Sequence, residues 1–314
     1  MTNKKDTSWK KVAGWYDKTV KEEESYQNKV ILPNLSRWFH DLKGKKVIDV
    51  GCGQGFFSRL LAEKGATVTG VDSGGSLIQI AKMVRLGSFD KAQDKSPQER
   101  NKNIKYVKAD AQNLSFAKAG EFDMALCVLS LQNMENLKAV LGEISRVLKP
   151  NGRLIAVLNH PAFRIPQNSS WGFDEGNEDT APQTAQYQNS SEANPPSLKL
   201  RKGSPHFESS PQAARYRAEE NKIQYRRIDS YLSPAKIKID MHPSEKIKKV
   251  YTYSFHHSIQ DYMKALAASS LAIVKLEEWI SHRKSETGPR AKAEDIARKE
   301  IPAFMAFEAI KLAK

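Results

Sequence analysis

Cysteine is scarce in this chain. Only Cys52 and Cys127 occur among 314 residues, and neither has the CxxC or similar spacing of a metal site. We therefore expect no disulfide bond and no metal centre. Both cysteines are interpreted as small buried residues, because Cys127 lies in an apolar run and Cys52 lies between two glycines.

Long apolar stretches are also missing. The first residues, MTNKKDTSWKKVAGWYD, are charged and contain no apolar stretch of signal-peptide length. No later segment is long and apolar enough to span a bilayer. The sequence predicts a cytoplasmic protein without a membrane span, either a monomer or a homodimer.

A concentrated basic arm is absent although the chain is basic. Lys and Arg total 50 against 36 Asp and Glu, which gives a formal net charge of +14. Such a surplus attracts anions in general. A dedicated nucleic-acid binder usually gathers its cations on one face or interleaves them with aromatic residues. The dispersed charge therefore disfavours nucleic acid as a partner.

Strand-like and helix-like patterns alternate from residue 46 onward. This alternation indicates a parallel sheet in an α/β fold. The expected strands are 46–50, 67–71, 104–108, 122–129 and 153–158, and the expected helices follow the first, second and fourth of them. A turn at 150–152 should separate the last helix from its strand. Before residue 46, two helical patterns make a helical segment over 1–45, the second with Leu35, Trp38, Phe39 and Leu42 on one face.

Two polar segments interrupt this pattern. Residues 87–103 read as an inserted loop. Residues 175–221 are rich in Ser, Pro, Asn, Gln and Glu, so we expect much of this second segment to be disordered. The runs IQYRRIDSYL and KIKKVYTYSF suggest a hairpin-like layer over the sheet. A helix at 259–268, a strand near 273–277 and a last strand in IPAFMAFEAIKL follow.

A glycine-rich turn stands out in VIDVGCGQGFF, residues 47–57. Gly51, Gly53 and Gly55 follow a strand and precede a helix, where backbone N–H groups can meet a nucleotide-like ligand. Glycine is required where a Cβ would collide with that ligand. The spacing is GxGxG rather than the dinucleotide GxGxxG, because Phe56 stands where a third glycine would be needed.

Two further aspartates stand at strand ends. Asp72 ends the second strand, where an ionised carboxylate suits two ribose hydroxyls. Asp110 follows the third strand, where a carboxylate can accept a hydrogen bond from an adenine amino group. An aspartate at such a place is also a common helix cap or turn former. Because these aspartates follow strands next to the one that leads into the glycine turn, the binding role is favoured.

Together, DVGCGQG, GVD, KADA and FDMALCVLSLQNMEN resemble class I S-adenosylmethionine-dependent methyltransferases, in particular small-molecule, type 11-like members. The resemblance covers about the first half of the chain. It implies a Rossmann-like, doubly wound sheet of seven strands whose last strand is antiparallel. It further implies an N-terminal helical lid over 1–45, a cofactor-binding core over 46–159, an inserted substrate-side cap over 160–256, and completion of the core by 257–314.

The resemblance also implies roles for single residues. S-adenosylmethionine would be the cofactor, with Asp49 toward its methionine amino group and Leu129 flanking the methionine end. The remaining cofactor contacts would come from Gly51, Cys52, Gly53, Gly55, Asp72, Ser73, Asp110 and Ala111. Tyr16 and Tyr26 are lid candidates, although Tyr16 and Trp15 at helical spacing are also typical of a packed core.

Catalysis by such a protein needs mainly in-line placement of the acceptor, with desolvation and sometimes a base. The segments beyond the strand ends supply candidates for these tasks. His160 and His257 are the first choices for a base, each with a packing role as its alternative. Substrate contacts are expected from Arg164, Tyr225, Arg226 and Asp229.

The acceptor class is narrowed by two absences. Methyltransferases that act on the amino group of adenine or glutamine share an Asn/Asp-Pro-Pro-aromatic motif after the fourth strand, and this chain has LSLQN there. Cytosine C5 methylation requires a cysteine nucleophile, and neither Cys52 nor Cys127 suits that role. A small organic acceptor, at oxygen or carbon more than nitrogen, fits best. An RNA or protein methyltransferase, and a non-catalytic S-adenosylmethionine-binding protein, stay open as alternatives.

Overall fold

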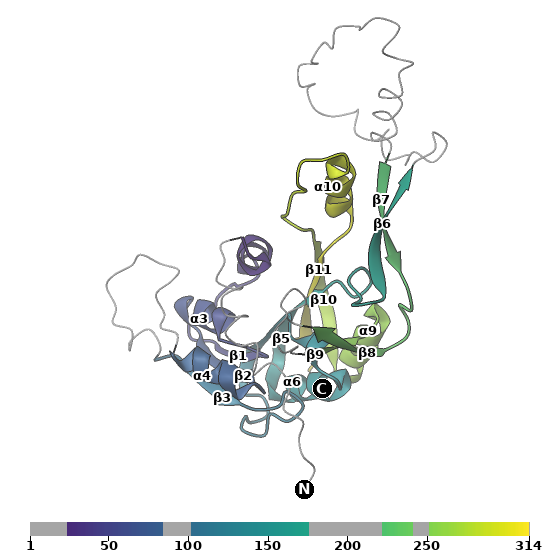
Figure 1. The fold of residues 1–314 in the computed structure, drawn as a ribbon. Coiled ribbons are helices and arrows are strands. Elements are labelled where there is room, and N and C mark those ends of the chain that lie inside the picture. Colours follow the sequence, from purple (N-terminus) through teal and green to yellow (C-terminus); the bar gives the residue numbers. More distant parts are fainter. Residues whose placement is uncertain (1–23, 84–101, 176–221, 241–250, 314) are drawn as a thin grey trace, which may run out of the picture. The chain divides into compact units, whose positions relative to one another are not determined.

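The computed structural model describes residues 24–83, 102–175, 222–240 and 251–313 (Figure 1). Tyr16 and the greater part of the predicted loop 87–103 and of the predicted disordered segment 175–221 lie outside the described residues. Two compact units are distinguished. The first comprises the described residues within 1–169, 228–282 and 302–314, and the second those within 170–227 and 283–301.

A seven-stranded sheet forms the centre of the first unit. Its order is β10-β11-β5-β4-β1-β2-β3, and β11 runs antiparallel to both of its neighbours. The strands are β1 Lys46–Val50, β2 Thr67–Asp72, β3 Ile104–Lys108, β4 Phe122–Val128, β5 Leu148–Asn159, β10 Leu271–Trp279 and β11 Phe304–Lys311. The predicted doubly wound sheet with an antiparallel last strand is confirmed.

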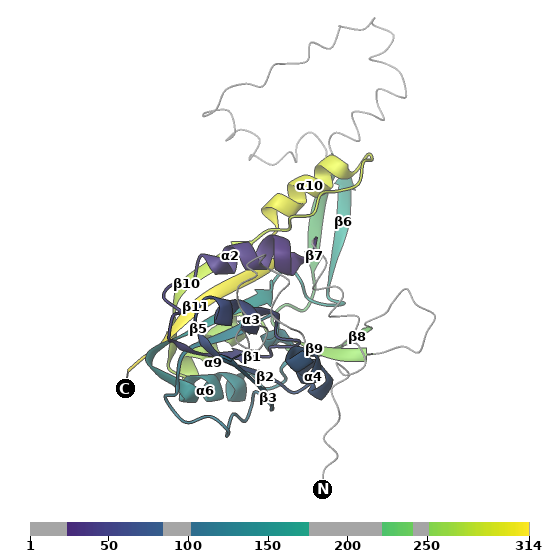
Figure 2. The same cartoon turned by 90° about the vertical axis from the view of Figure 1, so that its left-hand side faces the viewer.

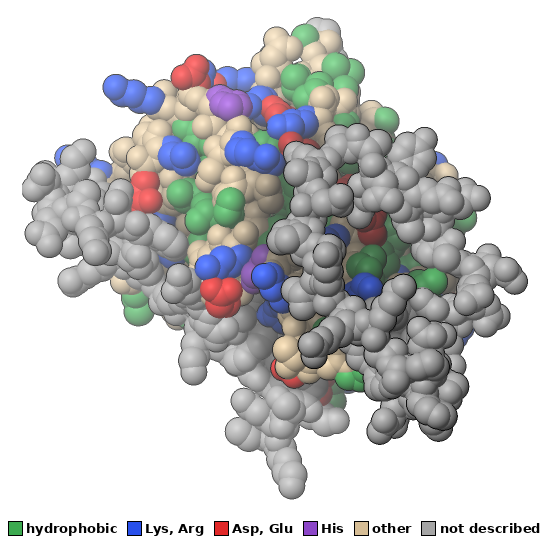
Figure 3. Space-filling model, turned by 90° about the horizontal axis from the view of Figure 1, so that it is seen from above, with side chains coloured by type: hydrophobic (Ala, Val, Ile, Leu, Met, Phe, Trp, Pro, Cys, Tyr) green, Lys and Arg blue, Asp and Glu red, His purple; other side chains and the backbone are tan. Residues whose placement is uncertain are grey.

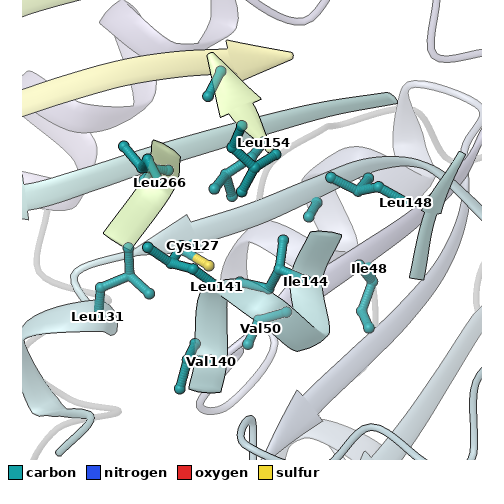
Figure 4. Packing of buried hydrophobic residues seen from close by; sticks show 14 of the residues in the cluster. Ile48, Val50, Cys127, Leu131, Val140, Leu141, Ile144, Leu148, Leu154 and Leu266 are labelled. Carbon is teal, nitrogen blue, oxygen red and sulfur yellow. The ribbon is translucent and has the colours of Figure 1, made fainter. Parts of the chain in front are cut away.

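Helices cover both faces of this sheet because its buried strands are apolar on both sides. Ile48 and Val50 face the cluster that contains α6 (Leu137–Val147) and α9 (Ile259–Ala268), and Val47 faces the cluster that contains α2 (Leu32–Ser36) and α3 (Phe56–Glu63). Figure 4 shows the first cluster, and Figure 2 shows the helices around the sheet. The helix α4 (Gly75–Met83) packs on β2 and β3.

Local signals fix where two of these helices begin. The Asn136 side chain accepts a hydrogen bond from the Ala139 N–H at 3.0 Å and caps α6. Ser258 and Asp261 form a reciprocal capping box at the start of α9. Each cap satisfies backbone donors that the first helical turn leaves without partners.

Three predictions of local structure need correction. The turn expected at 150–152 lies inside β5, where Asn151 has φ +61° and the register with β4 shifts. The helix expected through Leu42 ends at Ser36, although Leu35, Trp38, Phe39 and Leu42 are all buried. The apolar residues of this pattern are therefore buried although the helix covers only the first part of it.

The third correction concerns the two β-like runs of the insertion, which do not pair with each other. The strand β7 (Lys222–Ile228) pairs with β6 (Ser169–Glu175), and β9 (Tyr251–His256) pairs antiparallel with β8 (Ala235–Asp240). The partner β6 (SSWGFDE) has no clear strand pattern, whereas β8 (AKIKID) alternates apolar and polar residues. The helix α10 (Ala291–Glu300) belongs to the second unit, so this unit takes residues from both the predicted cap and the predicted C-terminal part.

Within the described ranges, no helix combines the length and apolar character needed to cross a bilayer.

We expect the Leu141→Ala variant to lose about 2–5 kcal/mol of unfolding free energy. Leu141 on α6 is 0% exposed in the core cluster, so truncation leaves a cavity. Urea unfolding followed by circular dichroism measures the loss. The Leu312→Ala control, at a residue that is 52% exposed, should change stability by less than about 0.5 kcal/mol. Equal effects of the two changes would contradict this description of the core.

Candidate functional site

The glycine turn joins β1 to α3 at the carboxyl edge of the sheet. The N–H groups of Gly51 and Cys52 both donate to the Val71 carbonyl, at 2.7 and 2.9 Å, which fastens the turn to the neighbouring strand β2. Gly51, Gly53 and Gly55 have φ of +76°, +55° and +80°. These left-handed conformations disfavour any side chain at the three positions.

Packing inside the chain gives a further reason for two of these glycines. A Cβ at Gly51 would lie 2.4 Å from the Ser130 Cβ, and one at Gly55 would lie 2.2 Å from the Tyr106 hydroxyl oxygen. The close approach predicted for a ligand is thus already made by the chain's own side chains there. Ser130 and Tyr106 support the turn from the loop after β4 and from β3.

Asp49 is buried beneath the turn. It is 2% exposed, and its carboxylate accepts a hydrogen bond from the Ser58 hydroxyl on α3 at 2.6 Å. Burial and, to a smaller extent, the nearby Asp72 raise the pKa of Asp49 to about 7, while the Ser58 hydrogen bond and Arg59 oppose the rise. Asp49 therefore changes its charge near neutral pH.

Asp72 at the end of β2 holds two loops together. Its carboxylate oxygens accept from the Gly53 N–H at 2.9 Å and from the Gly74 N–H at 2.7 Å. Burial raises the pKa of Asp72, and the two backbone hydrogen bonds oppose this rise. Each oxygen keeps lone-pair capacity for one more donor.

A hollow lies on the glycine turn. It brings together five of the predicted cofactor residues, Asp49, Gly51, Cys52, Gly53 and Leu129. It also includes five residues that the sequence interpretation missed: Gln27, Gln54, Phe56, Phe57 and Val128. Phe56 and Phe57 adjoin the glycine pattern, which is the signal that points to them, whereas no pattern in the sequence singles out Gln27.

Leu129 turns the chain sharply after β4. Its φ is +51°, a left-handed conformation that is costly for a residue with a branched side chain. The Leu129 N–H donates to the Val157 carbonyl at 2.8 Å, and the next residue, Ser130, donates its hydroxyl to the Val50 carbonyl at 2.9 Å. Such strain at a hollow is typical of functional sites.

The predicted adenine residues follow β3. Asp110 is exposed, and its side chain accepts a hydrogen bond from the Gln112 N–H at 3.0 Å, while Ala111 packs against the core. The Ala109 N–H donates to the Asp72 carbonyl at 3.1 Å, which links this loop to the end of β2. Ser73, the residue after Asp72, is exposed.

Tyr26 and Arg164 lie together. The Arg164 guanidinium carbon is 5.8 Å from the centroid of the Tyr26 ring and 5.5 Å from that of Phe304. The Tyr26 hydroxyl forms a 3.0 Å hydrogen bond with Ser281. Gln27, the next residue, lines the hollow, so this aromatic group adjoins the candidate site.

His160 follows β5 and is 1% exposed. Its Nε2 lies 2.5 Å from a Glu278 carboxylate oxygen, and its Nδ1 accepts from the Ala162 N–H at 3.2 Å. Burial lowers the pKa of His160, while Glu278 opposes this change. Both ring nitrogens have partners within the chain, which favours a structural role over that of a base.

His257 differs from His160. Its Nε2 is buried and has no hydrogen-bond partner among the described residues, and its ring lies edge-on to Tyr262 with centroids 5.9 Å apart. Burial lowers the pKa of His257, whereas Asp261 raises it. The ring is therefore held toward its neutral form, as a base would require.

The other substrate candidates are dispersed. Asp229 is exposed in the first unit, where its N–H donates to the Asn168 carbonyl at 2.8 Å. Tyr225 and Arg226 lie on β7 in the second unit, where the Arg226 guanidinium is 4.9 Å from the Trp171 ring centroid. A role for Tyr225 and Arg226 beside the cofactor stays a prediction.

Charged side chains on the surface are mixed. On the face drawn in Figure 3, Lys and Arg side chains are scattered, with Asp and Glu side chains near several of them. Within the described parts of the chain, no three His, Cys, Asp or Glu side chains come together as a metal site would require.

Comparison with known proteins agrees with this geometry. Residues 48–156 match the family model described as a methyltransferase domain. A ubiquinone biosynthesis O-methyltransferase from Pseudomonas fluorescens is 31% identical over 143 residues, which are 45% of this chain and 55% of that protein. The chain thus spans about half the length of the curated relatives it matches.

Solved structures share the fold. An S-adenosylmethionine-dependent methyltransferase from Mesorhizobium loti has a TM-score of 0.54 at 20% identity and covers 88% of this chain and 96% of its own. A structure from Listeria monocytogenes, described as a putative S-adenosylmethionine-dependent methyltransferase, has a TM-score of 0.54 at 18% identity and covers 90% and 97%. Residues 48–156 thus match a methyltransferase domain, the chain shares the fold of these solved methyltransferases, and the predicted resemblance is confirmed.

Binding of S-adenosylhomocysteine should strengthen as pH rises through about 7. An ammonium group of the ligand beside Asp49, as the resemblance implies, would favour the ionised form of this carboxyl, whose pKa is about 7 in the free protein. We expect the Kd at pH 6 to exceed that at pH 8 about tenfold, measured by calorimetry. The Asp49→Asn variant is the control, and its affinity should not depend on pH in this way. If the affinity of the variant depends on pH as steeply as that of the wild type, another group than Asp49 is titrating.

Stability should respond to Asp49 in the opposite sense. The folded chain holds this proton more tightly than the unfolded chain, in which the pKa of Asp49 is near the ordinary aspartate value of 3.8. Stability therefore declines as pH rises from about 4 to about 7. In urea unfolding at pH 8, the Asp49→Asn variant should be at least as stable as the wild type, because it buries no charge. A marked loss of stability in this variant would contradict the view that the buried charge of Asp49 destabilises the fold.

Proposed function

We propose that the protein is an S-adenosylmethionine-dependent methyltransferase that acts on a small organic acceptor. The carrying observation is the pair of buried carboxylates, Asp49 and Asp72, beside the glycine turn. Burial disfavours the ionised form of both groups, so a ligand that brings cationic or hydroxyl donors would stabilise them. S-adenosylmethionine has such donors in its ammonium group and its ribose.

The residues of the site suit this cofactor in their polarity. Asp72 would hold the ribose hydroxyls, Asp49 the amino group, and Asp110 with Ala111 the adenine. When bound, S-adenosylmethionine would supply an electrophilic methyl group. Phe56, Phe57, Val128 and Leu129 make one side of the hollow apolar, which excludes water from the reacting atoms.

An oxygen acceptor is favoured within this proposal. The curated relatives carry the name O-methyltransferase, which favours an oxygen nucleophile in the acceptor, such as a phenol hydroxyl. His257 is the better candidate for a base, because its buried Nε2 has no partner in the described chain, whereas both nitrogens of His160 have one. Arg164, which follows β5, and Tyr26, whose ring its guanidinium contacts, would approach the acceptor.

Calorimetric titration with S-adenosylhomocysteine tests the cofactor assignment. The Asp72→Ala variant removes a charged acceptor of hydrogen bonds, typically worth about 1.5–3 kcal/mol, so affinity should fall about 10- to 150-fold. Asp72→Asn keeps one acceptor oxygen and should lose less. No heat and no thermal shift with the wild type at millimolar ligand would contradict the proposal.

Methyl transfer is tested separately with a panel of phenols and catechols and labelled S-adenosylmethionine. We expect turnover by the wild type and at least about a hundredfold lower kcat/KM for His257→Ala, the low end of the range for a general base. Cofactor binding without transfer to any acceptor would favour the non-catalytic alternative.

A further inference from the structure

Ser58 is a fully buried hydroxyl beside the candidate site. It lies in the first turn of α3 and is 0% exposed. A buried hydroxyl without a partner destabilises the fold, so its hydrogen bond is a fixed part of the structure. The partner is Asp49, whose Oδ2 accepts from the Ser58 Oγ at 2.6 Å.

Packing against β2 holds the Ser58 hydroxyl in place. Gly70 pairs with Asp49 in the register of β1 and β2. A Cβ at Gly70 would lie 2.9 Å from the Ser58 Oγ and 2.7 Å from the Tyr106 Cδ1. The missing side chain at Gly70 therefore leaves the space in which Ser58 and the Tyr106 ring pack, and the hydroxyl has little freedom to exchange Asp49 for another partner.

Titratable groups face Asp49 from each of the surrounding elements. They are Asp72 from β2, Cys52 from the glycine turn, Arg59 from α3, Tyr106 from β3 and Cys127 from β4. Burial raises the pKa of Cys52, Tyr106 and Cys127, so these three groups stay uncharged near neutral pH. Asp72 adds to the effect of burial and disfavours the ionised form of Asp49.

The groups that favour the ionised form of Asp49 are few. The Ser58 hydroxyl has the largest effect among them, followed by the Ser58 N–H, and Arg59 has the smallest. The Arg59 Nη1 instead donates to the Gln54 carbonyl at 2.7 Å. The charge of Asp49 therefore depends mainly on one hydroxyl.

We propose that Ser58 is a positioning residue, whose hydroxyl keeps the Asp49 carboxylate ionised and oriented for the ammonium group of S-adenosylmethionine. Ser58 thereby sets the lower pH limit of cofactor binding, an inference that rests on the proposed function. A carboxylate has about four lone-pair sites, so Asp49 can accept from Ser58 and from a ligand at once. Asp49 lines the hollow and Ser58 does not, so Ser58 acts through Asp49.

Calorimetric titration of the full chain with S-adenosylhomocysteine, from about pH 6 to about pH 8.5, tests this role. Ser58→Ala removes the hydroxyl and should raise the pH midpoint of binding by about one unit, because a hydrogen bond to a charged group is worth about that much. Since the pKa of Asp49 is about 7, the Kd should rise about fivefold at pH 7 and less than about twofold at pH 8.5. A purely structural role would weaken binding by the same factor at every pH.

Three further variants serve as controls. Ser145→Ala changes another buried serine, on α6 and outside the hollow, and should keep the midpoint of the wild type. Ser58→Cys retains a weaker donor, so it should shift the midpoint in the same direction by less, and it replaces Ser58→Ala if that variant does not fold. With Asp49→Asn already present, Ser58→Ala should change the Kd less than about twofold at any pH.

The charge of Asp49 can also be followed without a ligand. Its carboxyl carbon resonance, assigned by its loss in Asp49→Asn, reports protonation of this side chain in the free protein. The pKa of Asp49 should be about one unit higher in Ser58→Ala than in the wild type. Circular dichroism confirms that each variant is folded.

The outcomes separate this inference from the proposed function. A wild type that does not bind S-adenosylhomocysteine would contradict the proposed function, while the carbon resonance would still show whether Ser58 controls the charge of Asp49. If the wild type binds, an unchanged midpoint in Ser58→Ala, or an equal loss of affinity at every pH, would overturn the role of Ser58. An equal shift in Ser145→Ala would overturn it as well.

Discussion

The carboxylate of Asp72 is the interaction on which the candidate site depends. It accepts hydrogen bonds from the N–H groups of Gly53 and Gly74, so one side chain fixes both the glycine turn after β1 and the start of α4 after β2. The loops after the adjacent strands β1 and β2 are thereby held in a fixed position relative to each other. The cost is a buried carboxylate with a raised pKa, which is why a ligand rich in donors suits this edge of the sheet.

The sheet and the polar part of the site could be predicted from the sequence, because their signals are local. Apolar runs that alternate with helical patterns define β1 to β5, and Asp49, the glycines and Asp72 stand next to strand ends. Side chains brought in from distant elements could not be predicted. Tyr106 is two residues from the end of β3, and only the pairing of Tyr106 with Gly70 places its ring against Gly55.

The corrected elements fail for related physical reasons. The strand β6 has a weak pattern, and its pairing with β7 is accompanied by the contact between Arg226 and the Trp171 ring, which no local pattern reveals. His160 was interpreted as a base from its place after β5. Its contact with Glu278 comes from a strand 118 residues later in the chain, and no local pattern carries that information.

That contact also shows how β10 is integrated into the fold. Glu278 binds His160 after β5, while Glu277, the preceding residue, binds Trp38 after α2, so consecutive carboxylates fasten opposite faces of one strand. The antiparallel strand β11 lies between β5 and β10, and the insertion of β11 leaves β10 as the edge. A strand held on both faces in this way is fixed in the sheet by side chains from distant parts of the chain as well as by its pairing with β11.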